Sequence, residues 1–390
     1  MDNKKLNIQT KLIHGGNEGH KSASGDVIPG IHLSTTYERN SEGINGEFIY
    51  SRAANPNRKL LENKIAAIEN AEEVISFSSG MAAINALLEN ILEPNSHIII
   101  PNDCYHGTKA LVETFFTKWN ISFTEVECTE TINFENAIRE NTKLIWIETP
   151  SNPQLKITDI AAVAIIAKQK NIKVVCDNTF ATCLIQNPFL FGADFVMHSS
   201  TKFYGGHSDI LGGLVVAKTK TAISDSIRLY QKTAGAVPAP FDCWLLNRSL
   251  ATFAMRVKQQ NENAMQIALF LEKHPSIEKV FYPGLVSHKN HNVAKMQMCE
   301  GFGSIISVLI RADEQKVLQI ASCFKLIKHA TSLGGVETLI EQRRSVEGEH
   351  PISPANLLRI SVGIEFVGDL IDDLGEGLKM VYCFPNPVSG

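Results

Sequence analysis

Apolar residues along the chain first follow a helical period and then gather into short runs. Leu60, Leu61, Ile65 and Ile68 lie on one face of a helix predicted over residues 57–70. Short runs rich in Ile and Val follow, and helical stretches such as Met81–Leu92 and Asp159–Lys170 separate most of them. The predicted strands are Val74–Ser78, His97–Pro101, Ile121–Val126, Lys143–Glu148, Ile172–Asp177, Asp194–His198 and Gly213–Ala217. This alternation predicts an α/β fold in which helices cover both faces of a mostly parallel, seven-stranded sheet.

The rhythm changes after about residue 245. The sequence predicts one long helix from about Arg248 to Lys273 and a last helix near Val367–Val381. Strands are predicted between them at Ile277–Phe281, Ser304–Ile310 and Leu358–Val362. Residues 1–57, in contrast, show little periodicity and many Gly, Ser, Thr and Asn residues. We therefore expect an N-terminal arm (1–57), a large domain (58–245) and a smaller C-terminal α+β domain (246–390).

Composition narrows the class of protein. Of the 390 residues, 44% are hydrophobic and 20% are charged, which is typical of a globular protein. The net charge of -4 argues against a nucleic-acid-binding protein, and no apolar run is long enough for a membrane helix. The N-terminal residues have no apolar core, so we expect a cytoplasmic location. The pair His288 and His291 has no accompanying ligands, so no metal site is predicted.

Three groups of residues with chemical potential directly follow predicted strands, where ligands of parallel sheets bind. Ser79-Gly80 enters a helix and could bind a phosphate there, although a serine in this place can also be an ordinary helix cap. Asp177 ends a buried strand, where an acid needs a cation or donors, or else it caps the next loop. Ser199-Ser200-Thr201-Lys202 combines hydroxyl groups with an amine, although the lysine could simply be solvated.

One cofactor explains all three groups together. Pyridoxal 5′-phosphate (PLP) needs a lysine for its Schiff base, a carboxylate beside its pyridine nitrogen and a site for its phosphate. The spacing from Asp177 to Lys202 fits the ends of two neighbouring strands. The sequence therefore predicts a PLP enzyme.

Nearly the whole chain resembles the trans-sulfuration family of fold-type I PLP enzymes, which includes cystathionine γ-synthase, cystathionine γ-lyase, cystathionine β-lyase and methionine γ-lyase. The matching segments are Tyr50-Ser-Arg-Ala-Ala-Asn-Pro56, Ser79-Gly-Met-Ala-Ala83, Trp146-Ile-Glu-Thr-Pro-Ser-Asn-Pro153, Asp177-Asn-Thr-Phe180, His198-Ser-Ser-Thr-Lys202, Gly206-His-Ser-Asp209, Tyr282-Pro-Gly-Leu285, Ser332-Leu-Gly-Gly335 and Leu358-Arg-Ile-Ser-Val-Gly363. So many matches in the same order make the resemblance very specific.

The resemblance implies a role for each matched residue. Lys202 would carry the cofactor and move protons, Asp177 would face the pyridine nitrogen, and Tyr105 would stack on the ring. The phosphate would be bound by Gly80, Met81, Ser199 and Thr201, and by Tyr50 and Arg52 of a neighbouring subunit. The substrate would contact Asn152, Ser332 and Arg359, whose planar fork suits an α-carboxylate. A shared site of this kind implies a homo-oligomer, and we expect a tetramer of two active dimers.

The reaction depends on positions where this chain departs from its γ-acting relatives. Those relatives carry an acid, an arginine and a glutamate where this chain has Ile49, Ala110 and Thr331. Loss of three distal charges favours β-elimination, as in a cystathionine β-lyase, over γ-replacement or γ-elimination. His106 and Lys109 are candidates to compensate for the missing charges. The segment from Arg343-Arg344 to His350 also differs from the family pattern, and we interpret its arginines as solvated surface charges, the alternative being a contact to an anion.

An aminotransferase and a PLP-binding protein without catalysis are the alternatives from other classes. The density of trans-sulfuration motifs argues against the first. The complete set of Lys202, Tyr105, Asp177 and Arg359 argues against the second.

Overall fold

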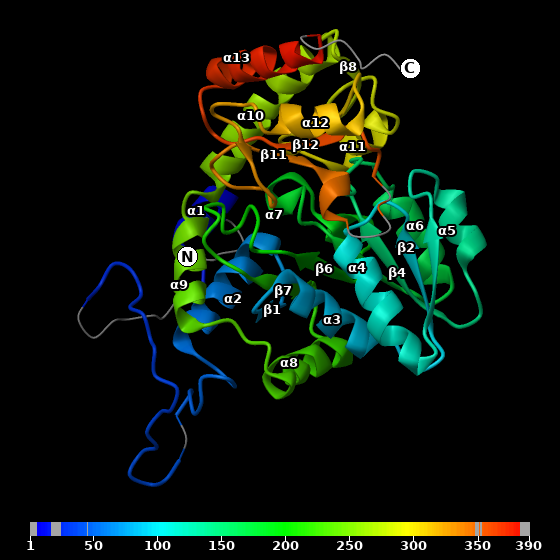
Figure 1. Ribbon diagram of the computed structural model, residues 1–390. Coiled ribbons are helices and arrows are strands. Elements are labelled where there is room, and N and C mark those ends of the chain that lie inside the picture. Colours follow the sequence, from blue (N-terminus) through cyan, green and yellow to red (C-terminus); the bar gives the residue numbers. More distant parts are fainter. Residues whose placement is uncertain (1–5, 17–24, 45, 348–350, 352, 383–390) are drawn as a thin grey trace.

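The large sheet of this computed structural model has seven strands in the order β1-β7-β6-β5-β4-β2-β3 (Figure 1). The structure describes residues 6–16, 25–44, 46–347, 351 and 353–382. The strands are β1 (Glu73–Phe77), β2 (His97–Pro101), β3 (Ser122–Val126), β4 (Thr142–Glu148), β5 (Lys173–Asp177), β6 (Phe195–His198) and β7 (Gly213–Ala217). Only β7 runs against the others, because it pairs antiparallel with both β1 and β6. The predicted mostly parallel sheet is therefore confirmed.

Helices cover both faces of this sheet, and alternate residues of each strand supply the two cores. On β2, Ile98 and Ile100 pack towards α3 (Gly80–Ile91) and α8 (Ala222–Ala234), whereas Ile99 packs towards α5 (Thr131–Ala137) and α6 (Ile160–Gln169). Near β1 and β7 the second face is covered by α2 (Pro56–Glu69) and α9 (Pro240–Leu250). Burial on both faces explains why these strands appear as nearly continuous apolar runs in the sequence.

A second sheet of five strands, in the order β10-β11-β12-β9-β8, lies above the carboxyl ends of the first in Figure 1. Its strands are β8 (Ile277–Phe281), β9 (Ile305–Ile310), β10 (Lys328–His329), β11 (Leu339–Gln342) and β12 (Leu357–Ser361). It packs against α10 (Phe253–Glu272), α12 (Glu314–Ala321) and α13 (Val367–Leu378). The short helices are α1 (Ile8–His14), α4 (His106–Leu111), α7 (Thr182–Ile185) and α11 (His291–Gln297), and single helical turns cover Val112–Phe116, Thr117–Trp119, Pro188–Phe191, Arg343–Val346 and Lys379–Val381.

The long helix predicted from about Arg248 to Lys273 is confirmed over α10, but it begins later, at Phe253, and residues 248–250 belong to α9 instead. The break lies beside the carbonyl of Ser249, which accepts hydrogen bonds from the hydroxyl of Thr252 (3.3 Å) and from the guanidinium of Arg256 (3.1 Å). Side-chain donors of this kind compete with the amide that would continue the helix. The periodic apolar pattern continues across the break and therefore does not reveal it.

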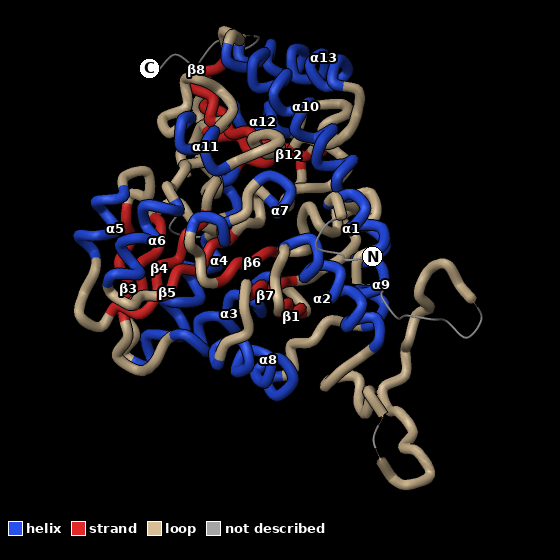
Figure 2. The backbone as a smooth tube through the Cα atoms, turned by 180° about the vertical axis from the view of Figure 1, so that it is seen from behind, coloured by secondary structure: helices blue, strands red, loops and turns tan. Residues whose placement is uncertain are grey.

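The first 57 residues divide into a packed part and an extended part. Helix α1 packs on α2 and α10, and its Leu12 is only 1% exposed. Much of the described stretch between residues 25 and 55 instead extends away from the body, as Figures 1 and 2 show from opposite sides. Part of it stays attached, because the Pro29 carbonyl accepts a hydrogen bond from Trp244 Nε1 (2.8 Å) and the His32 amide donates to Asn57 Oδ1 (2.7 Å). Their apolar side chains are open to solvent, for example Val27 (99% exposed) and Leu33 (70%). Within the predicted N-terminal arm, residues 1–5, 17–24 and 45 lie outside the described residues.

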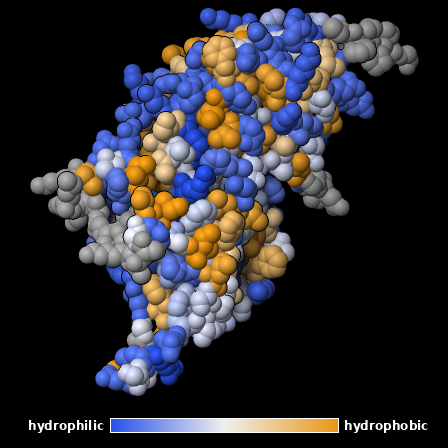
Figure 3. Space-filling view, turned by 90° about the vertical axis from the view of Figure 1, so that its left-hand side faces the viewer, coloured by the Kyte–Doolittle hydropathy of each residue, from blue (hydrophilic) through white to orange (hydrophobic). Residues whose placement is uncertain are grey.

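The side of the body next to this extended segment also carries apolar surface. Figure 3 views that side and shows apolar patches among the polar ones. Phe241 at the start of α9 and Met255 at the start of α10 are both exposed. Within the described part of the chain, no helix has both the length and the apolar character needed to cross a membrane.

Candidate active site

A cavity of about 290 Å³ lies where the carboxyl ends of the large sheet face the smaller sheet. Its wall combines residues that are far apart in the sequence, from the start of α3, the ends of β4, β5 and β6, and the second sheet. Ten of the twelve predicted site residues line it: Gly80, Met81, Tyr105, Asn152, Asp177, Ser199, Thr201, Lys202, Ser332 and Arg359. The remaining two, Tyr50 and Arg52, are not among the lining residues of this chain.

The start of α3 forms one end of the cavity. Ser79 caps this helix by accepting a hydrogen bond from the amide of Ala82 (3.1 Å). The amides of Gly80 and Met81 belong to the first turn and have no acceptor within the helix. A Cβ atom on Gly80 would lie 2.9 Å from the hydroxyl of Ser199, so only glycine allows this close approach. Amides, hydroxyl groups and the positive end of the helix dipole together form a site suited to a phosphate.

Two acidic side chains lie beside each other at the ends of neighbouring strands, because Glu148 on β4 pairs in register with Asp177 on β5. Burial raises the pKa of Asp177, and hydrogen bonds from Thr179 partly oppose that rise. Burial, followed by repulsion from Asp177, raises the pKa of Glu148 well above its usual range. Glu148 accepts a hydrogen bond from the amide of Tyr105 (2.8 Å). A cationic ligand group beside Asp177 would relieve the cost of burying its charge.

Glu148 was missed in the sequence analysis. It carries the same signal that identified Asp177, an acidic residue at the end of a buried strand, and that signal applied to β4 would have found it.

Lys202 reaches into the cavity from the turn that follows β6. Its Nζ atom donates a hydrogen bond to Ser332 Oγ (3.0 Å). Burial, and then the nearby positive charge of Arg359, lower the pKa of Lys202 to about 8. Ser332 has a φ of +90°, a backbone conformation that a serine rarely adopts and that functional sites often contain. Its carbonyl accepts a hydrogen bond from Arg359 (3.1 Å), so Ser332 contacts both Lys202 and Arg359.

Arg359 on β12 is buried and firmly held. Nη1 donates to Asn152 Oδ1 (2.9 Å), and Nη2 donates to Glu341 Oε2 (2.7 Å) on the neighbouring strand. Burial, and then repulsion from Arg343, lower the pKa of Arg359 to about 10. The side chain therefore presents a fixed positive charge to the cavity at neutral pH.

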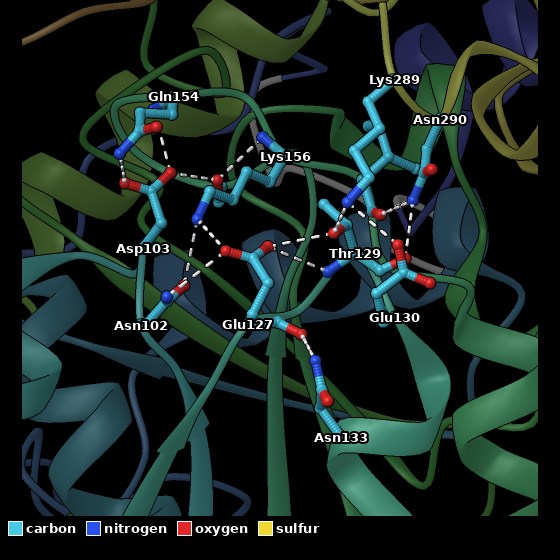
Figure 4. Close-up of polar contacts among 12 residues, drawn as sticks. Asn102, Asp103, Glu127, Thr129, Glu130, Asn133, Gln154, Lys156, Lys289 and Asn290 are labelled. Atoms are coloured by element: carbon cyan, nitrogen blue, oxygen red, sulfur yellow. Dashed lines mark hydrogen bonds and ion pairs between the residues drawn. The ribbon is translucent and has the colours of Figure 1, made fainter.

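The loop that carries Asn152 is anchored by the polar network in Figure 4. Asp103, which follows β2, accepts hydrogen bonds from the hydroxyl of Ser151 and from the amide of Gln154 (2.9 Å). Lys156 binds Glu127 at the end of this loop (2.5 Å). The network continues through Thr129 to Asn290, whose Nδ2 donates to the Thr129 carbonyl (3.0 Å). It thus ties the loop to both the large sheet and the C-terminal part of the chain.

Tyr105 and His106 line the cavity just before and at the start of α4. Burial raises the pKa of the Tyr105 phenol and lowers the pKa of the His106 imidazole, which Arg343 lowers further. The rings of Tyr105 and His106 pack edge to face at 4.8 Å. Lys109, in contrast, is paired with Glu125 (3.0 Å) and does not line the cavity.

The interpretation of Arg343 as a solvated charge is wrong. Its side chain is 5% exposed, donates to Glu341 Oε2 (2.9 Å) and lines the cavity. Arg344 does lie at the surface, where it faces Glu314 at 3.5 Å. The rest of the predicted segment, residues 348–350, lies outside the described residues. Sequence spacing could not separate the two arginines, because the turn of residues 343–346 directs neighbouring side chains to different environments.

Tyr50 and Arg52 lie on the extended N-terminal segment. The Arg52 guanidinium is 5.6 Å from the centre of the Tyr50 ring and donates to the carbonyl of Lys232 (2.5 Å). Both side chains are exposed. Three neutral residues of this chain stand where its γ-acting relatives carry charges. Thr331 lines the cavity, whereas Ile49 and Ala110 are exposed and do not line it.

Comparison with known proteins identifies the class. The family model of the Cys/Met metabolism PLP-dependent enzymes matches residues 9–379. The chain is 42% identical to a cystathionine gamma-synthase of Mycobacterium leprae, covering 95% of this chain and 97% of the relative. It is 40% identical to a cystathionine beta-lyase of Coxiella burnetii, covering 97% and 99%. The structure of metB from Corynebacterium glutamicum superposes with a TM-score of 0.94 at 40% identity, covering 97% and 99%.

The chain therefore belongs to the Cys/Met metabolism PLP-dependent enzyme family, as the sequence motifs predicted. It is an enzyme, and PLP is its cofactor. The cavity fits this cofactor, since it combines an amine, a buried carboxylate and an anion site at a helix N-terminus. Relatives with β-lyase and γ-synthase names are almost equally similar to the chain, so overall identity does not select between the two reactions.

Proposed function

We propose that the protein is a cystathionine β-lyase, which cleaves cystathionine by α,β-elimination to homocysteine, pyruvate and ammonia. The observation that carries this choice is Thr331, a neutral residue in the cavity wall where γ-acting relatives have a glutamate. The alternative is a γ-synthase or γ-lyase, and methionine γ-lyase activity is a more distant one.

The proposal assigns the cofactor to the inner part of the cavity. Lys202 would hold PLP covalently, and Asp177 would pair with the nitrogen of the PLP ring. Tyr105 would stack on that ring. Gly80, Met81, Ser199 and Thr201 would bind the phosphate. When bound, PLP supplies an electron sink that stabilises negative charge at the substrate Cα.

Lys202 is suited to move the substrate protons. Its lowered pKa of about 8 leaves a useful fraction of neutral amine near neutral pH. The hydrogen bond to Ser332 fixes the position of the amine. We assign to Lys202 the removal of the Cα proton and the return of a proton to the leaving sulfur.

The substrate would enter with its α-carboxylate against Arg359 and Asn152. Because the Asp103 network anchors the Asn152 loop, this contact has little freedom to move. β-Elimination needs only this anchor, a Cα proton facing Lys202 and a correctly oriented Cβ–S bond. γ-Chemistry needs a second proton transfer at Cβ, for which a distal charge would keep the substrate extended.

The proposal includes a homo-oligomer, a tetramer of two active dimers. The exposed apolar side chains of the extended N-terminal segment support it, because such a segment gains stability by packing on another chain. Tyr50 and Arg52 of that segment would reach the phosphate site of the neighbouring subunit.

Product analysis with purified holoenzyme and cystathionine tests the reaction. Homocysteine with pyruvate is the expected pair, whereas cysteine with 2-oxobutyrate would establish γ-cleavage instead. Thr331→Glu should raise γ-cleavage relative to β-cleavage. Thr331→Gln is the matched control, because glutamine has the shape of glutamate without its charge. If both variants give the wild-type product ratio, Thr331 does not control the choice.

A further inference from the structure

We infer that Arg343 selects substrates whose leaving half ends in a carboxylate. This inference rests on the proposed function in placing the cofactor at Lys202, its phosphate at the start of α3 and the α-carboxylate at Arg359. It assigns a specificity-determining role to a residue that the family motifs do not cover.

The first line of argument is position. Arg343 Nη1 and Arg359 Nη2 donate to the same oxygen, Glu341 Oε2, at 2.9 and 2.7 Å. One nitrogen of each arginine is therefore held next to the other by a shared carboxylate oxygen. Both arginines line the cavity, so a ligand held at Arg359 has a second guanidinium beside it. Tyr105 and His106 line the same cavity as Arg343.

The second line of argument is charge. Three cationic side chains line the cavity: Lys202, Arg343 and Arg359. The proposed site uses Lys202 for the cofactor, Arg359 for the α-carboxylate, and amides with hydroxyl groups for the phosphate. Arg343 is the lining cation for which the cofactor and the reacting end of the substrate provide no anion.

The third line of argument is incomplete pairing. Among the described residues, Arg343 Nε has no hydrogen-bond acceptor although it is buried. The carboxylate of Glu347 is 4.0 Å from Nε and also accepts a hydrogen bond from the amide of Ser353 (2.9 Å). Two guanidinium groups donate to one oxygen of Glu341, Oε2. A buried cation in this situation is stabilised by an added anion.

A carboxylate is the anion that fits. The planar guanidinium fork binds a carboxylate through two parallel hydrogen bonds. The leaving half of cystathionine ends in a carboxylate, whereas a thioether with an alkyl leaving group offers Arg343 no partner.

The test uses ligands that cannot react. L-2-Aminosuberate has its two carboxylates separated by as many atoms as in cystathionine, but it has no sulfur to expel. Its ω-amide has the same shape with a neutral end. Titration of the cofactor absorbance of the holoenzyme gives a Kd for each ligand, whichever bond the enzyme cleaves in its substrate.

Wild-type enzyme should bind L-2-aminosuberate at least about tenfold more tightly than the ω-amide, equivalent to about 1.4 kcal/mol. Arg343→Gln should remove this preference by weakening the binding of aminosuberate alone, and Arg343→Lys should keep part of it. Arg344→Gln is the matched control, because that arginine lies outside the cavity, and it should retain the preference.

Two results would overturn the inference. One is a wild-type enzyme that does not distinguish the two ligands, a result that needs no variant to fold. The other is an Arg343→Gln enzyme that binds both ligands equally more weakly, because that pattern means Arg343 only supports Arg359 through Glu341. A γ-cleavage product from cystathionine would refute the proposed β-lyase activity but leave this binding test intact.

Discussion

Replacing Arg359 by lysine should strongly weaken recognition of the α-carboxylate while keeping the positive charge. A guanidinium has five N–H donors, and Arg359 uses three of them on Asn152, Ser332 and Glu341. Two N–H groups remain for a ligand, one on Nε and one on Nη1, so a ligand can accept at most two hydrogen bonds from Arg359. A lysine ammonium has only three donors, and the same three acceptors within the chain would occupy them all.

The expected loss follows from this count of donors. A hydrogen bond to a charged group contributes about 1.5–3 kcal/mol, so losing two gives an upper range of about 3–6 kcal/mol. The retained charge recovers part of that. We expect a net loss of roughly 3 kcal/mol, or a Kd on the order of a hundredfold higher.

The assay titrates holoenzyme with L-norleucine, which has no leaving group, and with L-norleucinamide, which has no α-carboxylate. Wild-type enzyme should strongly prefer the acid, and Arg359→Lys should keep only a small part of this preference. A variant that binds norleucine within threefold of wild type would refute the donor count. Equal weakening of acid and amide would show that the substitution disturbs the cavity rather than one contact.

Two further predictions address the lysine and the assembly. In the enzyme stripped of PLP, labelling of Lys202 by acetic anhydride should rise through a midpoint near pH 8. The neutral amine is the form that reacts, and burial lowers the pKa of Lys202 below the ordinary 10.5. Exposed Lys258 is the reference, and a midpoint near 10.5 for Lys202 would contradict the burial argument. Mixed oligomers of Arg52→Ala and Lys202→Ala chains should regain activity that neither parent has, because one kind of site then contains both native residues; verified hybrids without activity would mean that the arm does not complete a neighbouring site.

The sequence predicted most of the fold because burial on both faces leaves a strong signal in the large sheet. All seven of its strands lie within one or two residues of their predicted positions. In the smaller sheet, β10 has two residues and β11 has four, too few for a period to show. The break between α9 and α10 was missed because it depends on local side-chain hydrogen bonds to the Ser249 carbonyl rather than on the apolar pattern.

The site was predictable where one residue type serves one chemical need at a strand end, as for Asp177 and Lys202. Glu148 was overlooked although it carries the same signal. The burial of Arg343 could not be predicted, since it follows from a turn that places β11 beside the cavity and from pairing with Glu341. The roles of Tyr50 and Arg52 depend on a second chain, and they stay predictions.

The most direct test of the account is to trap the cofactor on its lysine. Holoenzyme reduced with borohydride and digested should give one peptide that carries a stable pyridoxyl group, and fragmentation should place that group on Lys202. In Lys202→Ala enzyme, the same treatment should leave no labelled peptide. A pyridoxyl group on any other lysine of the wild-type enzyme would contradict the assignment of this cavity as the PLP site.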